Sequence, residues 1–308
     1  NKTEIKKVYD YIENLFSKDV FDCEYLENEG VVSQVIYFKG ANWRKAKLLL
    51  SGHIDVVPAE DKEFVPRIEG NKIYGRGTAD MKGGVVAMIF AMLRLVEEDK
   101  KHDCVLILNS DEEIGGHNGV GYLVEKENLR PGFVFCPDGP ATNKLTIITK
   151  EKGVAWIELS AVGKSAHASM SYLGKNAIEL LFLAWQKICA IVQPSADTWT
   201  TSAVMSHIET SNSGYNCVPS DARAVVDLRF TEDFAKTPDE VLEKIKKVLP
   251  AGASVRKIYG GEILQTDGNN PQVLKLQQIM NKVCGYNVPI GFSHGSSDVR
   301  FFGSIGFN

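Results

Sequence analysis

Residues 46–58 have the sequence AKLLLSGHIDVVP, in which an apolar run ends in a histidine and an aspartate. Two further apolar runs follow, VLIL at 105–108 and FVF at 133–135. Strands that are apolar on both faces are typical of a parallel sheet buried on both sides. Helix-like segments at 83–98 and 119–127 alternate with them. We therefore predict an α/β catalytic domain with a mainly parallel sheet and helices on both faces.

The pattern of elements changes after about residue 150. Strand-like and helix-like segments now form a two-layer α+β module of normal size for a small domain. The strands are expected at 156–162, 201–208, 222–230 and 254–259, and the helices at 176–192 and 238–249. A helix at 271–283 and a Gly/Ser-rich turn at 291–298 then return to the first domain. We predict a catalytic domain of residues 1–150 and 263–308, interrupted by an inserted lid domain of residues 151–262.

The composition is that of a soluble globular protein with a small-molecule substrate. The 308 residues are 44% hydrophobic and 24% charged, with a net charge of -4. The longest strongly apolar run, residues 85–93, is too short to span a membrane, and no Lys/Arg cluster suggests a nucleic acid or membrane partner. Six cysteines are scattered without a C-x-x-C pair, and the chain begins without a signal-like segment. We expect a reducing, cytoplasmic location.

Imidazole and carboxylate side chains follow the predicted core strands. Sites in open parallel sheets form beyond the carboxyl ends of the strands, so these side chains should converge in one crevice. They are His53, Asp55, Asp80, Glu112, Glu113 and Asp138. Two carboxylates ~5 Å apart repel each other by about 3 kcal/mol at an effective dielectric constant of ~20. A bound cation is the simplest way to balance five of them.

The local sequence around each of these residues favours a catalytic metal site. His53 and Asp55 share one face of a strand, so the carboxylate can orient the imidazole. The small-residue loop at 75–84 brings Asp80 close to the backbone, and it matches neither phosphate-binding glycine pattern. Glu112 and Glu113 point in different directions, so one can bind metal while the other faces substrate. Ligands without thiolate suit catalytic Zn, with Co or Mn as substitutes.

A second motif, GFSHG at 291–295, matches the G-x-S-x-G nucleophile elbow of α/β-hydrolases. That fold places its acid and its histidine after the serine, whereas only fifteen residues follow Ser293 here and the adjacent His294 is the last histidine. We therefore prefer a turn that binds a substrate carboxylate through backbone N–H groups, with Gly295 and Ser296 as the substrate-binding residues.

Three motifs together carry a family resemblance. SGHIDVVP at 51–58, GRGTADMKGG at 75–84 and DEEIGG at 111–116 closely resemble the di-zinc amidohydrolase and metallopeptidase family. This family contains acetylornithine deacetylase, succinyl-diaminopimelate desuccinylase, aminoacylase, carnosinase and glutamate carboxypeptidase. The similarity extends from about residue 46 to 303, and GKSAHAS at 163–169 and residues 214–229 look like its lid signatures.

The resemblance implies a role for each candidate residue. His53, Asp80 and Asp138 would hold one metal, and Asp80 would bridge to a second metal held by Glu113. Glu112 would be the general base and Asp55 would orient His53. The catalytic His167, commonly donated by a partner subunit, would polarise the scissile carbonyl, while Asn216 and Arg229 would bind substrate, the latter as a fork on a carboxylate. These implied residues are Glu112, Asp55, His167, Asn216, Arg229, His53, Asp80, Glu113 and Asp138.

Two departures from the family pattern modify these expectations. The deacetylases usually carry Glu-Pro-Thr where this chain has Pro137-Asp138-Gly139, a shorter carboxylate in the same role. The family supplies a last metal-binding histidine beyond the point where this sequence ends, at Asn308, so the catalytic domain is expected to be C-terminally incomplete. We expect two zinc ions per subunit in a complete protein, and a weakened second site in this chain.

The expected function is hydrolysis of the amide bond of a small N-acyl amino acid, of the acetylornithine or succinyl-diaminopimelate type. Metal coordination lowers the pKa of water from ~15.7 toward ~7, which supplies a hydroxide nucleophile, and Glu112 would accept its proton. A dipeptidase, a carboxypeptidase or a catalytically impaired relative that binds amino-acid-like ligands remain alternatives. The resemblance and the small size of the inserted domain also predict a homodimer formed through that domain.

Overall fold

The computed structural model describes residues 2–98, 102–139, 145–192 and 198–303. The chain divides into two compact units, which are described separately. Unit 1 comprises the described residues of 1–147, 268–290 and 297–307, and unit 2 those of 148–267 and 291–296. The segment 291–296, expected in the catalytic domain, therefore groups with unit 2.

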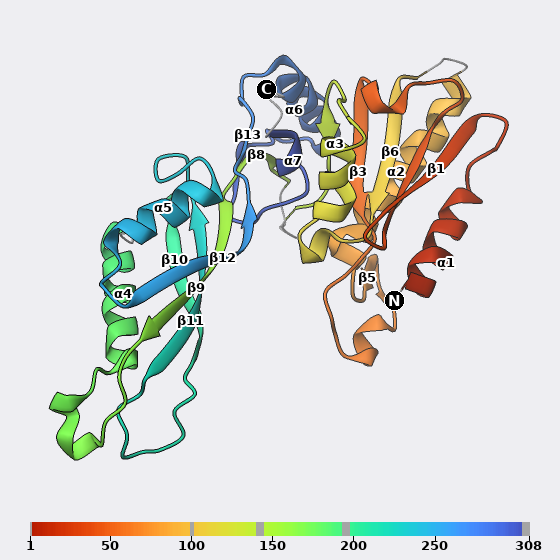
Figure 1. The fold of residues 1–308 in the computed structure, drawn as a ribbon. Helices are drawn as coiled ribbons and strands as arrows, with labels where there is room; N and C mark the ends of the chain where they lie inside the picture. The colour runs from red at the N-terminus through yellow and green to blue at the C-terminus, as the bar shows by residue number, and fades with distance from the viewer. Residues whose placement is uncertain (1, 99–101, 140–144, 193–197, 304–308) are drawn as a thin grey trace. The chain divides into compact units, whose positions relative to one another are not determined.

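Unit 1 is built on a mixed sheet of five strands in the order β1-β2-β6-β3-β7 (Figure 1). Its strands are β1 (Phe21–Asn28), β2 (Val31–Phe38), β3 (Leu48–His53), β6 (Cys104–Asn109) and β7 (Val134–Phe135). Strand β3 pairs in parallel with both β6 and β7, while β1, β2 and β6 are joined by antiparallel pairing. The parallel strands are those predicted from the apolar runs.

Helices cover both faces of this sheet. One face packs against α1 (Lys2–Glu13) and α2 (Gly83–Leu95), and the other against α3 (Tyr122–Glu125) and α7 (Arg300–Gly303). Strand β6 is buried along its whole length because its residues alternate between these two cores. The α/β fold class predicted from the sequence is thereby confirmed. Unit 1 also contains α6 (Pro271–Cys284) and the short hairpin of β4 (Arg67–Glu69) and β5 (Lys72–Tyr74).

Strand β1, which forms a hairpin with β2, is an addition to the predicted fold. Its sequence, FDCEYLEN, alternates apolar and acidic residues, so the period of two was present in the sequence. Both turn residues, Glu29 and Gly30, have positive φ values of 46° and 78°, as two-residue hairpin turns require. The acidic side chains made this strand less conspicuous than the wholly apolar strands beside it.

Unit 2 contains a four-stranded antiparallel sheet in the order β10-β11-β9-β12. Its strands are β9 (Gly153–Val162), β10 (Ser202–Glu209), β11 (Asp221–Phe230) and β12 (Ala253–Gly261). Two helices, α4 (Ala177–Ile191) and α5 (Pro238–Val248), pack on one face and share its core. A small sheet is formed by β13 (Leu264–Gln265), β8 (Ile147–Glu151) and β14 (Ile290–Ser293), in the order β13-β8-β14. The first residues of the expected Gly/Ser turn are thus strand.

A helix needs about 20 predominantly apolar residues to span a bilayer. Within the described part of the chain, no helix is both long and apolar enough to span a membrane.

Candidate metal centre

His53 is the last residue of β3 and is 1% exposed. Its backbone N–H donates to Sδ of Met81 at 3.3 Å, which fixes the loop before α2 against the end of the strand. Gly52 permits this close approach, because a Cβ there would lie 2.8 Å from Cε of Met88 on α2. The Nε2 atom of His53 then lies 3.0 Å from Oδ1 of Asp80 and 3.8 Å from Oδ2 of Asp138.

The acidic pair that follows β6 lies on a short 3-10 turn, Glu112–Ile114. Two glycines in the left-handed region end the turn, Gly115 at φ 109° and Gly116 at φ 62°. The backbone N–H groups of these glycines donate to the carbonyls of Glu112 and Asp111, respectively, at 2.9 and 2.8 Å. This carboxylate turn, residues 111–116, holds Glu112 and Glu113 beside His53.

Asp55 connects the histidine with the carboxylate turn. Its Oδ2 accepts from the backbone N–H of Glu113 at 3.0 Å, and its Oδ1 lies 3.4 Å from Nδ1 of His53. Its main-chain carbonyl is 3.2 Å from the same Nδ1. Asp55 is therefore placed to fix the ring of His53 and the position of Glu113 together, which is consistent with the orienting role expected from the sequence.

The clustered acids bind protons more tightly than isolated acids do. Burial raises the pKa of Glu112 above its usual value, and the nearby charge of Asp298 adds to the effect. Burial is also the main cause of the raised pKa of Glu113 and of Asp138. For His53, burial opposes the charged form, but Asp55 and the other carboxylates raise its pKa overall. The side chains thus favour any bound positive charge, either a proton or a metal ion.

The donor set fits a divalent cation. His53 forms one group with Asp80 and Glu113 and a second with Glu112 and Asp138, and within each group the ligand atoms lie within 4.8 Å of one another. Imidazole and carboxylate oxygens without thiolate are suited to zinc and to similar catalytic metals. The buried Oδ1 of Asp55 has no hydrogen-bond partner among the described residues, which leaves an acceptor beside the centre for a cation to balance.

Further residues beside the centre were not singled out in the sequence. Asp111 is 2% exposed and accepts from the backbone N–H groups of Asn118 and Gly119 at 3.0 and 2.9 Å. Asp298 and Arg300 are buried against the carboxylate turn. Burial lowers the pKa of Lys82, which stands near Asp55, Glu113 and Asp80. Lys82 and Asp111 lie inside the motifs quoted from the sequence. Asp298 and Arg300 do not, and no sequence pattern connects these two residues with a turn almost two hundred residues earlier.

Two of the expected lid residues lie together in unit 2. His167 is exposed, and its Nδ1 lies 2.8 Å from Oγ of Ser169. It forms a β-bridge with Cys217, and the carbonyl of Asn216 accepts from the backbone N–H of Ala168 at 2.8 Å. His167 and Asn216 are therefore presented by neighbouring segments.

Arg229 lies at the other end of the same sheet. It is eight residues along β11 from Asp221, which is about 26 Å at the usual strand rise of about 3.3 Å per residue. Its Nε and Nη2 atoms donate to Oδ1 and Oδ2 of Asp227 at 2.9 and 3.0 Å, so Asp227 orients the guanidinium. Arg229 and the pair His167 and Asn216 therefore do not converge within unit 2.

The two serines Ser293 and Ser296 of the Gly/Ser segment differ in their hydrogen bonding. Gly295 donates its backbone N–H to Oγ of Ser293 at 3.1 Å, which engages the serine of the apparent nucleophile motif. Oγ of Ser296 is buried and has no hydrogen-bond partner in the described part of the chain. Gly295 and Ser296, the two residues of this segment that were expected to bind substrate, belong to unit 2.

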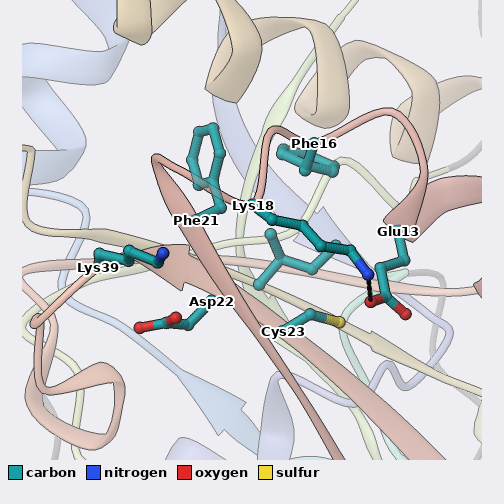
Figure 2. Close-up of a pocket in the computed structure, with 8 residues that line it drawn as sticks. Glu13, Phe16, Lys18, Phe21, Asp22, Cys23 and Lys39 are labelled. Atoms are coloured by element: carbon teal, nitrogen blue, oxygen red, sulfur yellow. Dashed lines mark ion pairs between the residues drawn. The ribbon is translucent and has the colours of Figure 1, made fainter.

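Two cavities lie apart from the residues expected in the site. Figure 2 shows the first, of about 220 Å³, beside β1, where Lys18 and Glu13 form an ion pair of 3.6 Å. Its lining combines Phe16, Phe21 and Ile36 with Cys23 and charged side chains. The second, of about 290 Å³, is lined by residues between 38 and 45 together with His102 and Asp103. Neither contains a residue expected in the metal centre.

Comparison with known proteins gives the same assignment as the motifs. Over 268 residues the chain is 29% identical to a succinyl-diaminopimelate desuccinylase of Rhizorhabdus wittichii, covering 83% of this chain and 70% of that protein. It is 27% identical over 304 residues to the enzyme of that name from Coxiella burnetii, covering 93% and 80%.

Solved structures share the fold. Aminopeptidase PepT from Bacillus cereus matches with a TM-score of 0.76 at 19% identity, covering 99% of this chain and 83% of that one. The metallo-carboxypeptidase Sso-CP2 from Sulfolobus solfataricus matches with a TM-score of 0.75 at 20% identity, covering 98% and 83%. A family model matches residues 49–307. The resemblance inferred from the motifs is confirmed: the chain belongs to peptidase family M20/M25/M40.

Proposed function

We propose that this protein hydrolyses the amide bond of a small N-acyl amino acid. This is the reaction indicated by the name of its relatives, succinyl-diaminopimelate desuccinylase. The observation that carries this proposal is the convergence of His53, Asp80, Glu112, Glu113 and Asp138 at the carboxyl ends of β3 and β6. One imidazole and four carboxylates are the components of a hydrolytic metal centre that acts on amides.

In this proposal the metal is zinc, with cobalt or manganese as substitutes. His53, Asp80 and Asp138 would hold one ion, and Asp80 and Glu113 the other. Bound zinc would supply a Lewis acid and lower the pKa of a coordinated water. The proximity of Asp80 and Asp138 to the same Nε2 of His53 supports the first set of ligands.

Glu112 is the proposed general base. The raised pKa of its buried carboxyl brings its proton affinity closer to neutral pH, where a group that accepts and then donates a proton works best. Its carboxylate would accept the proton of the attacking water and then deliver that proton to the departing nitrogen. Asp55 would keep the ring of His53 and the backbone of Glu113 in place during both transfers.

Substrate recognition would involve unit 2 and a second copy of the chain. Because His167 and Asn216 lie at the opposite end of the sheet from Arg229, a homodimer would let each site take these groups from different subunits. Arg229 would grip the substrate carboxylate, and Gly295 and Ser296 would contribute polar groups. The edge strand β10 supports a dimer through unit 2, since it pairs only with β11 among the described strands and exposes Val204 and Ile208.

A cytoplasmic location is part of the same proposal. None of the six cysteines forms a disulfide, and Cys104 is buried in the core. Free thiols persist in reducing compartments, which favours the cytoplasm.

A panel of substrates tests the proposed function. The protein is stripped with a chelator, reloaded with zinc or cobalt, and supplied with N-succinyl amino acids, N-acetyl amino acids and unblocked dipeptides while amine release is followed. We expect metal-dependent release that is fastest with an N-acyl amino acid. Faster cleavage of dipeptides would show that the protein is a dipeptidase instead. If the metal-loaded protein cleaves none of these substrates, it is a binding protein without catalytic activity.

A further inference from the structure

Arg300 is a charged residue buried against the carboxylate turn. It is 2% exposed, and its guanidinium lies 4.4 Å from the centre of the Phe301 ring. Its Nη2 donates to the carbonyl of Gly115 at 2.6 Å, and its Nη1 donates to the carbonyl of Ser297 at 2.6 Å. A buried guanidinium that binds two main-chain carbonyls holds two separate segments at a fixed separation.

Asp298 restricts the same turn by its volume. A Cβ at Gly116 would lie 1.8 Å from Oδ1 of Asp298, so the carboxylate is seated directly against the glycine backbone. Asp298 is 5% exposed, and its Oδ1 lies 3.8 Å from Nη1 of Arg300. The ring of Phe301 extends the contact, because a Cβ at Gly121 would lie 3.0 Å from its Cε1.

The two sides of the carboxylate turn are therefore held by different parts of unit 1. Asp55 binds the backbone N–H of Glu113 on one side. Arg300 and Asp298 hold the carbonyl of Gly115 and the backbone of Gly116 on the other. The turn itself has only three 3-10 residues and two glycines, which are the most flexible residues, so its conformation depends on these outside contacts.

We propose that Arg300 and Asp298 are positioning residues that fix the backbone of Gly115 and Gly116 and thereby aim the carboxylates of Glu112 and Glu113. Neither residue needs to touch substrate for this role. Catalytic groups require placement within a fraction of an ångström, and a displacement of about 1 Å can reduce a rate about 100-fold. The effect on turnover rests on the proposed function, whereas the effect on the turn does not.

The experiment compares Arg300→Met and Arg300→Lys with the matched control Arg130→Met. Arg130 also donates to main-chain carbonyls of unit 1, those of Val124 and Leu129 at 2.7 and 2.8 Å, and both of these acceptors lie outside the carboxylate turn. Three quantities are measured on the full chain: hydrogen exchange of the backbone amides at 113–119 in the metal-free protein, zinc content, and kcat and KM with zinc bound.

We expect Arg300→Met to exchange the amides at 113–119 at least about tenfold faster, with those of β6 unchanged, and to lower kcat about 100-fold at nearly constant KM. Arg300→Lys should recover part of both losses because it keeps a cation beside Asp298. Arg130→Met should lower the stability of the protein without changing the exchange at 113–119 or kcat. Unchanged exchange at 113–119 in Arg300→Met, or equal loss of kcat in Arg130→Met, would overturn the proposal. If the wild-type protein hydrolyses none of the substrates, the proposed function fails. The hydrogen-exchange rates at 113–119 still decide whether Arg300 and Asp298 position the turn.

A second set of variants covers the case in which Arg300→Met does not fold. Gly116→Ala places its methyl group against Asp298, so it should accelerate exchange at 113–119. Asp298→Ala should also accelerate exchange there, because the turn loses the side chain against which Gly116 is seated, whereas Asp298→Asn, which keeps the volume but not the charge, should not. Equal exchange at 113–119 in Asp298→Ala and Asp298→Asn would show that Asp298 does not hold the turn by contact.

Discussion

Glu112 and Glu113 are neighbours in the sequence but have different surroundings. Glu113 accepts the backbone N–H of Val57 through Oε1 at 3.2 Å and gives its own N–H to Asp55. Glu112 is the more deeply buried of the two carboxylates, and the nearby charge of Asp298 adds to the rise in its pKa. This difference supports the proposed roles of Glu113 as an anchored metal ligand and of Glu112 as the general base.

Glu112→Gln should abolish turnover and leave the zinc content almost unchanged. The amide keeps the shape of the side chain but cannot accept a proton. Steady-state rates and metal analysis of the same sample check this expectation. Retention of more than a few per cent of the wild-type rate would remove Glu112 from the role of general base.

The residues of the centre were predictable to the extent that their motifs are local. His53, Asp80 and the pair Glu112 and Glu113 each stand in a short pattern beside a strand, so strand topology was enough to bring them together. Asp298 and Arg300 were not predictable, because their contact with Gly115 and Gly116 joins residues about 185 positions apart. No spacing rule applies at that distance.

Among the elements, most strands were predicted from the sequence, both the wholly apolar ones of unit 1 and the amphipathic ones of unit 2, whereas β1 and β14 were not. Strands β3 and β6 are buried on both faces, which leaves a continuous apolar run in the sequence. Strand β1 buries only Phe21 fully and has acidic residues among its apolar ones, and β14 ends in a Gly/Ser-rich segment typical of a turn. Pairing of β1 with β2 and of β14 with β8 makes these two segments strands.

Close packing of β9 against β11 gives a prediction for unit 2. A Cβ at Gly153 would lie 2.2 Å from the ring of Phe230, which is fully buried. Gly153→Ala should therefore destabilise the protein by about 1–3 kcal/mol through overpacking. Denaturant unfolding checks it, with Gly268→Ala as the control because its Cβ would be in ordinary contact at 3.4 Å. Equal unfolding midpoints for the two variants would contradict the expected overpacking.

For the molecule as a whole, the homodimer is open to direct test. Val204→Glu places a charge on the exposed edge strand β10 and should convert a dimer to a monomer at micromolar concentration. Tyr11→Glu, at an exposed position of α1 in unit 1, should leave the mass unchanged. Light scattering measures both. A wild-type monomer with full activity would show that no second subunit is needed.

Stability should depend on pH in opposite ways with and without metal. In the metal-free protein the raised pKa values of Glu112, Glu113, Asp138 and His53 mean that the folded state binds more protons than the unfolded state. Stability is therefore highest below the ordinary carboxyl pKa of about 4 and falls as pH rises through these raised values, past the ordinary histidine pKa of about 6.5.

Zinc competes with the same protons, so its affinity should rise over this interval. Melting temperatures between pH 5 and pH 8, measured with chelator and with zinc, check both trends. An increase in the melting temperature of the metal-free protein with pH would show that the carboxylates are not mutually repelling.

The contact between Arg300 and Gly115 also sets the stage of synthesis at which the carboxylate turn can complete its contacts. The carboxylate turn leaves the ribosome first, and its retaining arginine is added 185 residues later, after the whole of β9 to β12. At 5–20 residues per second that interval lasts about 10 to 40 s. Throughout it the nascent chain exposes its acidic turn without the segment that contacts Gly115, so the turn can complete these contacts only after Arg300 has been translated.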